Sequence, residues 1–333
     1  MRLLFFFLKF IISFRNLFSE KSYQVFLINQ KAIFIYRSNP EIVVRDYYFY
    51  VQGLLLDSLV ALNSKCLVFF ECPGLKLLKI CLPFYEIYLQ IEHTLLDPKA
   101  TKEFKTLPGK LSTGDGSENY LVRIAEFEKL NQASLVIDYS RVNLFNIASS
   151  ELLKNFRLKS FCISPSLYPI DTKTSGRSGV ITLFGNPEIP RRKLFLEALN
   201  NAQIEFKNVR GMYFGVEEVY RKAKIIVNVR QTDIFYTLEE LRVLPALRSG
   251  AIVISEVAPY IKKTAYSKFI IFGTIEELPG LIKEVEQNYQ VVHQRIFGDG
   301  SENSHFMKRM RRIEKCNVLS MQRAVNYLNS SAR

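Results

Sequence analysis

Five short apolar runs recur through the second half of the chain, and their spacing limits the possible folds more than any other feature. They occupy residues 180–184, 204–209, 224–229, 251–256 and 268–272. Between several of these runs, apolar residues recur at the three- and four-residue spacing of a helix: from Arg191 onward, near 216–222 and over 238–248. Because short buried strands that alternate with helices build parallel sheets, this half is predicted to be a Rossmann-like α/β unit.

The first half carries the same alternation in a weaker form. Its apolar runs occupy residues 24–29, 66–71, 82–90, 134–138 and 159–163. Helical spacing appears between them over 47–62, 120–130 and 148–156. The polar, Gly- and Ser-rich stretch 97–119 is predicted to be a long loop. A second α/β unit with a parallel sheet is therefore expected here.

The chain length and one polar stretch divide the protein into two domains. With 333 residues the chain exceeds the size at which one core stops growing, so two domains of about 150 residues each are expected. Residues 164–179 contain two Pro, two Gly and six Ser or Thr, which is typical of a linker. We predict domains at 1–165 and 180–303, with a basic helix at 304–333 that packs back across the first domain.

A formal net charge of +13 indicates an anionic partner, which could be nucleic acid, an acidic membrane or a phosphate-bearing small molecule. No nucleic-acid-binding motif accompanies the charge, so nucleic acid is the least favoured of the three.

Five cysteines at irregular spacing, without a Cys-x-x-Cys pair, indicate a reducing compartment. The three histidines are scattered, so no metal site and no cofactor are expected. We expect a cytoplasmic protein.

The stretch 3–14 is almost wholly apolar and lies between Arg2 and Arg15. It is interrupted by Lys9 and falls short of the roughly 20 residues that span a bilayer. Three interpretations remain open: contact with an anionic membrane surface, packing within the protein, or a cleaved signal.

Ligands of open α/β sheets bind beyond the carboxyl ends of the strands, so the residues after each predicted strand are the candidate site. Gly185 follows the run 180–184, and Arg191 and Arg192 follow at a helix start, where backbone N–H groups and guanidinium groups suit a diphosphate. An ordinary strand-to-helix turn with solvated arginines is the alternative. Asn228 and Arg230 end the run 224–229, where a polar strand end is equally expected.

Two further groups lie in the segment 237–256. Glu239, Glu240 and Arg242 begin a helix, where carboxylates are favourable; they could either cap the helix or bind sugar hydroxyls. Gly250 is predicted to end that helix. Ser255 and Glu256 then close the next strand at the open edge of the sheet.

The segment 237–256 resembles the nucleotide-sugar segment of group 1-type glycosyltransferases of the GT-B fold. The segments 183–199, 209–215 and 223–230 resemble the elements that precede it in this family. In the first half, 88–96 and 133–147 resemble its acceptor-side motifs. The resemblance implies two Rossmann-like domains that face a central cleft, and metal-independent transfer of a sugar from a nucleotide-sugar donor to a glycan or lipid-linked acceptor.

The resemblance also implies roles for individual residues. Those implied to bind the donor are Gly185, Arg191, Arg192, Asn228, Arg230, Glu239, Glu240, Arg242, Ser255 and Glu256. Those implied on the acceptor side are Glu92, His93, Asp138, Tyr139, Ser140 and Asn143. The catalytic candidates are Glu240 and, as a base if the reaction inverts configuration, Glu92 or His93.

The family usually carries a second glutamate on this helix, but in this chain Leu247 and Arg248 stand in that region. The missing glutamate favours the alternative of a catalytically silent nucleotide- or lipid-binding module. A dehydrogenase is disfavoured, because no Gly-x-Gly-x-x-Gly follows a predicted strand.

Overall fold

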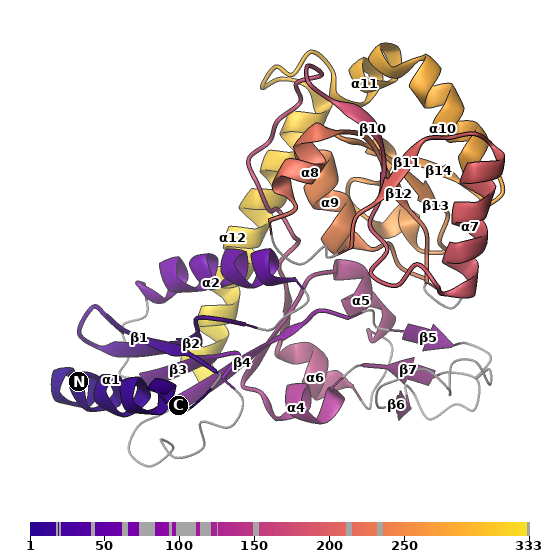
Figure 1. The fold of residues 1–333 in the computed structure, drawn as a ribbon. Coiled ribbons are helices and arrows are strands. Elements are labelled where there is room, and N and C mark those ends of the chain that lie inside the picture. Colours follow the sequence, from indigo (N-terminus) through magenta and orange to yellow (C-terminus); the bar gives the residue numbers. More distant parts are fainter. Residues whose placement is uncertain are drawn as a thin grey trace.

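The computed structural model has a mixed α/β fold built on two main sheets (Figure 1). It describes residues 1–17, 19, 21–40, 44–61, 66–72, 84–92, 95–97, 111–113, 121–124, 126–148, 153–210, 215–231 and 236–331. Each main sheet has its own buried apolar clusters, and the long carboxyl-terminal helix α12 (His305–Ser331) contributes to clusters of both.

The first sheet has six strands in the order β1-β2-β3-β4-β8-β9. They are β1 (Tyr23–Ile28), β2 (Ala32–Arg37), β3 (Cys66–Phe70), β4 (Phe84–Gln90), β8 (Leu135–Asp138) and β9 (Ser160–Cys162). All neighbours are parallel except β1, which pairs antiparallel with β2. Every residue of β2 and β3 is buried, as expected for central strands that are covered on both faces.

Helices cover both faces of this sheet. α2 (Arg45–Leu59) and the carboxyl-terminal half of α12 share one apolar cluster with the sheet. On the opposite face lie α1 (Arg2–Leu17), α4 (Phe127–Gln132) and α6 (Lys154–Leu158). The short helix α5 (Arg141–Asn146) follows the carboxyl end of β8. Three short antiparallel strands form a separate small sheet: β5 (Leu95–Asp97), β7 (Leu121–Arg123) and β6 (Leu111–Thr113).

The second main sheet has five parallel strands in the order β11-β10-β12-β13-β14. They are β10 (Ser178–Thr182), β11 (Phe206–Asn208), β12 (Ala223–Asn228), β13 (Ile252–Glu256) and β14 (Ile271–Gly273). The helices of this half are α7 (Pro190–Asn201), α8 (Glu217–Lys222), α9 (Glu240–Arg248), α10 (Leu278–Gln287) and α11 (Tyr289–Phe297), with 3-10 turns at Ile261–Lys263 and Ser267–Phe269. Since the strand order reverses direction between β10 and β12, the sheet has a topological switch point there, the usual ligand site of such sheets.

The prediction of an α/β fold is confirmed, but three local predictions differ from the structure. The strand β2 was not predicted, and it makes β1 an antiparallel edge strand. Its hairpin turn uses Asn29 and Gln30, both at positive φ, without the glycine that usually marks such turns in a sequence. Strands also occur at Leu111–Thr113, within the predicted loop, and at Leu121–Arg123, within a predicted helix.

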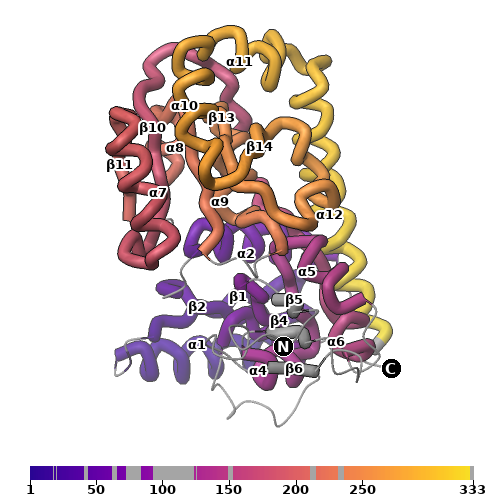
Figure 2. Tube along the Cα trace, turned by 90° about the vertical axis from the view of Figure 1, so that its right-hand side faces the viewer, coloured from indigo at the N-terminus to yellow at the C-terminus, as the bar shows by residue number. Residues whose placement is uncertain are grey.

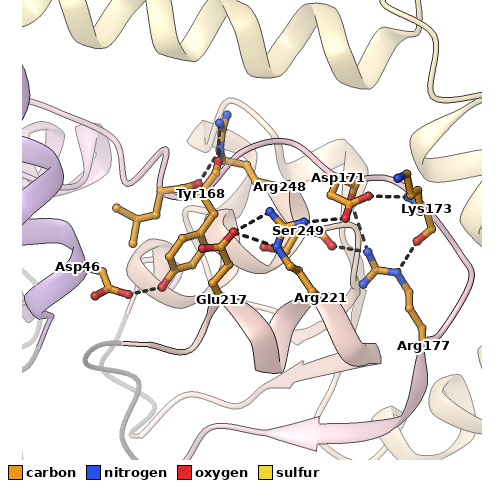
Figure 3. A network of polar contacts seen from close by, with 10 residues as sticks. Asp46, Tyr168, Asp171, Lys173, Arg177, Glu217, Arg221, Arg248 and Ser249 are labelled. Atoms are coloured by element: carbon orange, nitrogen blue, oxygen red, sulfur yellow. Dashed lines mark hydrogen bonds and ion pairs between the residues drawn. The ribbon is translucent and has the colours of Figure 1, made fainter.

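Residues 163–177 connect the two main sheets and are held by arginines (Figure 3). Arg248, at the end of α9, donates hydrogen bonds to the backbone carbonyls of Leu167 and Tyr168 and forms an ion pair with Glu314 of α12 at 2.6 Å. Arg221 of α8 pairs with Asp171 at 2.7 Å. The connection is therefore fixed to α8 and α9, and α9 is in turn paired with α12.

Candidate functional site

Polar side chains gather where the carboxyl ends of β12 and β13 lie side by side. Asn228 and Ser255 are register partners in the sheet, and the Asn228 amide donates a hydrogen bond to the Ser255 hydroxyl at 3.0 Å. The Asn228 carbonyl oxygen accepts a hydrogen bond from Arg242 of α9 at 2.7 Å. All three side chains are buried, so this layer ties α9 to the strand ends.

Glu256, the last residue of β13, organises two arginines around one buried carboxylate. The guanidinium groups of Arg191 and Arg230 both donate to Glu256 Oε1, the latter at 2.8 Å, and the Arg230 backbone N–H donates to Oε2 at 3.0 Å. Glu256 is 2% exposed, whereas the side chains of Arg191 and Arg230 are 23% and 14% exposed. The carboxylate is thus covered, while both arginine side chains remain partly exposed to solvent.

This cluster lies at the switch point of the sheet. Arg191 stands in the first turn of α7, which follows β10, and Arg230 follows β12. The positive end of the α7 helix dipole adds to the positive potential of the arginines. Gly185 is exposed in the turn that leads from β10 toward α7. An anion bound here would meet two guanidinium forks beside a helix N-terminus, an arrangement suited to phosphate groups.

Arg192 does not belong to this cluster. Its side chain is buried and its guanidinium lies 5.0 Å from the centre of the Phe184 ring, so it packs against the core of the second half. Of the two arginines that the sequence predicted to face a diphosphate, only Arg191 lies beside Glu256 at the strand ends.

Glu240, at the first position of α9, connects the two halves of the molecule. Its Oε1 accepts a hydrogen bond from the hydroxyl of Ser140 at 2.5 Å, and its Oε2 accepts one from Tyr266 at 3.0 Å. Ser140 is the N-cap of α5 and also accepts hydrogen bonds from the backbone N–H groups of Val142 and Asn143. Glu240 is buried. It therefore acts as a fixed polar contact between the strand-end layers of the two sheets.

The predicted acceptor-side residues lie together at the carboxyl end of β8. Asp138 accepts hydrogen bonds from the Ser140 backbone N–H at 2.8 Å and from the Asn143 amide at 3.0 Å. Asn143 also donates to the backbone carbonyl of Glu92 at 3.2 Å. Burial raises the pKa of Asp138 well above its ordinary range, and the nearby Glu240 adds to this effect. These hydrogen bonds hold β8, α5 and the end of β4 in one arrangement.

Burial also raises the pKa of the neighbouring Tyr139 phenol well above its usual value. The Glu92 side chain is exposed. Glu239 immediately precedes α9 and is half-buried. His93 lies outside the residues that the structure describes.

Tyr266 is a residue of this region that the sequence interpretation did not include. It lies in the loop between β13 and β14, buried, and burial raises the pKa of its phenol. Nothing in its local sequence distinguishes it from a core tyrosine. Its contact with Glu240 exists only because a loop 26 positions along the chain folds back onto α9.

Within the described ranges, no three His, Cys, Asp or Glu side chains are grouped as metal ligands would be.

Comparisons with known proteins add one partial similarity. The chain matches no family model. It is 26% identical over 125 residues to uncharacterized protein R358 of Acanthamoeba polyphaga mimivirus. The match covers 36% of this chain and 44% of the viral protein, so the chain spans less than half of that relative's length. The name of this relative assigns it no activity.

Proposed function

We propose that the protein is a glycosyltransferase that moves a sugar from a nucleotide-sugar donor to a glycan or lipid-linked acceptor, with the two main sheets acting as the facing domains of a GT-B enzyme. The observation that carries the proposal is the convergence of Arg191 and Arg230 on Glu256 at the switch point of a parallel five-stranded sheet. Ligands of such sheets bind at this point, and paired guanidinium groups recognise phosphate oxygens.

In the proposed reaction the two arginines hold the diphosphate of the donor. Negative charge develops on that diphosphate as the bond to the sugar breaks, and fixed cations lower the barrier because they are oriented before the reaction begins. Glu256 keeps the two guanidinium groups in place, since each donates a hydrogen bond to its carboxylate, and it also accepts one from the Arg230 backbone N–H. No step in this scheme requires a catalytic metal.

The acceptor would lie on the side of the β8 end, next to Asp138, Ser140 and Asn143. Glu240 and Ser140 are positioning residues in this scheme, since their mutual hydrogen bond sets how the two strand-end layers face each other. If the reaction inverts configuration, Glu92 or His93 would supply the base. We place the enzyme in the cytoplasm, where nucleotide-sugar donors would reach this site.

The direct test measures which part of a nucleotide the arginines recognise. Arg191→Ala and Arg230→Ala should each weaken binding of a nucleoside diphosphate by about tenfold to a hundredfold, because each removes a charge-assisted contact. Binding of the matching nucleoside should change by less than about threefold. Titration calorimetry with a panel of nucleosides, nucleoside diphosphates and nucleotide sugars, in EDTA, provides both numbers.

Arg311→Ala serves as the control, since Arg311 lies on α12 and pairs with the exposed Glu302. It should bind all ligands as the unmodified protein does. Equal losses for nucleoside and diphosphate in the Arg191 and Arg230 variants, or a failure of the unmodified protein to bind any nucleoside diphosphate, would contradict the proposal.

A second candidate is a nucleotide-binding module that performs no transfer. It is favoured by the buried state of Glu240, whose two carboxyl oxygens accept hydrogen bonds from Ser140 and Tyr266. This candidate predicts that a nucleoside diphosphate binds and stabilises the protein while neither transfer nor hydrolysis of any nucleotide sugar is detected.

A further inference from the structure

The helix α1 is apolar on two opposite faces, only one of which the protein covers. Leu8 and Ile12 are buried, and they pack in a cluster with Tyr23, Ile33 and Phe69 of the six-stranded sheet. This inner face explains why the helix docks on the sheet. It does not explain the composition of the outer face.

The outer face consists almost entirely of large apolar side chains in contact with solvent. The exposed fractions are 86% for Leu3, 64% for Phe6, 57% for Phe7, 72% for Phe10, 58% for Phe14 and 77% for Leu17. Positions 3, 7, 10, 14 and 17 follow the three- and four-residue spacing that places side chains in one stripe along a helix. Exposed apolar stripes of this kind mark surfaces that bind a partner.

The charges beside the stripe indicate which partner. Arg2 and Lys9 are exposed, Arg15 lies near the end of the helix, and the segment Arg2–Leu17 contains no Asp or Glu. The whole chain carries a formal net charge of +13. Cations beside a Phe- and Leu-rich face are the signature of helices that lie in the headgroup region of anionic membranes.

Two other occupants fit less well. A second copy of the chain, packed stripe to stripe, would bring together two helices that carry cations and no acidic residue. A membrane-spanning arrangement is disfavoured because, in the part of the chain that the structure describes, no helix combines the length and apolarity needed to cross a bilayer. An anionic bilayer surface satisfies both the apolar stripe and the cations.

We infer that α1 is an interfacial helix that binds the protein to an anionic lipid surface, with Leu3, Phe7, Phe10, Phe14 and Leu17 in the acyl region and Arg2 and Lys9 at the headgroups. Figures 1 and 2 both show α1 at the end of the molecule away from the five-stranded sheet, so a bilayer bound there would leave the Arg191–Arg230 cluster accessible. The inference concerns a different surface from the proposed nucleotide site and holds whether or not the protein transfers a sugar.

Co-sedimentation with vesicles tests this inference. The full chain should bind phosphatidylcholine vesicles that contain phosphatidylglycerol, and bind vesicles of phosphatidylcholine alone more weakly. Phe10→Glu should reduce binding by roughly a hundredfold, since it replaces an inserted ring with a charge that anionic lipid repels. Val291→Glu is the matched control, because Val291 is also 72% exposed, on α11 of the other half; this variant should bind as the unmodified protein does.

Two further measurements distinguish the electrostatic contribution of the cations from the insertion of the apolar stripe. Lys9→Glu should weaken binding by about tenfold or more at low salt and less at high salt, because it reverses one headgroup contact. The natural chain has no tryptophan, so Phe10→Trp provides a single reporter whose emission should shift to shorter wavelength when anionic vesicles are added.

Several outcomes would overturn the inference. They are the absence of vesicle binding by the unmodified chain, equal binding by Phe10→Glu and Val291→Glu, or an unshifted emission of the Phe10→Trp variant. Self-association that Phe10→Glu abolishes, seen by light scattering without any vesicle binding, would assign the stripe to a second copy of the chain instead. Because Phe10 faces solvent, its variants should retain the thermal stability of the unmodified protein.

Discussion

Arg191 and Arg192 are neighbours in the sequence and yet reach different surroundings. Successive residues of a helix point about 100° apart, so one guanidinium of the pair faces Glu256 at the strand ends while the other lies over the Phe184 ring. The sequence shows two equivalent cations at a helix start. Which of them reaches Glu256 depends on the direction in which the first turn of α7 faces the sheet.

His293 shows a different effect of burial on a single residue. It lies on α11 with one ring nitrogen 3.2 Å from the carbonyl oxygen of Gly250, and with the rings of Tyr289 and Phe297 nearby. Burial lowers the pKa of His293 from 6.5 to about 4; the nearby Arg177 also lowers it, while the hydrogen bond to Gly250 opposes the shift. The native protein therefore keeps this imidazole neutral in mildly acidic solution.

This shift predicts a specific loss of stability in acid. The unfolded chain binds a proton at His293 below pH 6.5, whereas the native chain does so only near pH 4. The stability contribution of the neutral side chain is thus complete above pH 6.5 and is lost as the pH falls toward 4. Between about pH 7 and about pH 5 the loss should amount to about 2 kcal/mol.

Urea unfolding at a series of pH values measures this loss. A His293→Gln variant has no titrating group at this position, so its free energy of unfolding should fall less steeply over the same range. Parallel pH dependences for the two proteins would show that burial of His293 does not affect its protonation.

At the scale of elements, the end of α9 illustrates a sequence prediction that the structure confirms and extends. Gly250 was predicted to end the helix; α9 ends at Arg248, and Gly250 has a φ of +79°. Gly250 also leaves room for the connection between the sheets, since a Cβ atom there would collide with the carbonyl oxygen of Asp171 and the side chain of Arg177. The sequence indicates the first role only.

Gly250→Ala should therefore lower the free energy of unfolding by roughly 2–4 kcal/mol, because it combines a left-handed backbone with a collision against the connection. Gly53→Ala is the control, since Gly53 lies within α2 and nothing would contact its added Cβ within 4 Å. That variant should be unchanged or more stable by up to about 1 kcal/mol. A similar small effect for both variants in chemical unfolding would refute the close approach at Gly250.

At the scale of the whole molecule, α12 belongs to both halves. Phe306, Met310 and Ile313 lie in the core of the five-stranded half, while Met321 and Val325 lie in the main cluster of the six-stranded half. Figures 1 and 2 show the helix running along both sheets. Midway, the Asn317 amide donates to the carbonyl oxygen of Ser164 in the connection at 2.7 Å. The two halves are thus joined by a continuous helix, by the Ser140–Glu240 contact and by the connection itself.

This arrangement predicts that the unmodified chain unfolds in one thermal transition. Met321→Lys, which places a charge at a fully buried position, should destabilise the six-stranded half by roughly 3–5 kcal/mol and separate the melting curve into two transitions. Leu319→Lys is the control, because Leu319 is 43% exposed on the same helix, and it should melt as the unmodified chain does. If Met321→Lys still melts in one transition at an unchanged temperature, α12 does not couple the halves.

Much of the fold could be predicted from the sequence because it depends on local patterns. The apolar runs at 224–229 and 251–256 became β12 and β13, since short β-rich runs between helices have few other arrangements. The polar residues that end these runs lie at the carboxyl edge for the same reason. The hairpin β1–β2 was not predicted, because its turn adopts positive φ at Asn29 and Gln30 instead of at a glycine.

The sequence by itself therefore determined the α/β class, the position of the strand-end residues along the chain and the basic, apolar character of α1. Only the tertiary structure decided that Glu256 gathers Arg191 and Arg230, that Tyr266 and Ser140 hold Glu240, and that the outer face of α1 stays uncovered. The physical reason is distance along the chain. Periodicity records which face of an element is apolar, whereas contacts between residues as far apart as Ser140 and Glu240 depend on how whole elements pack.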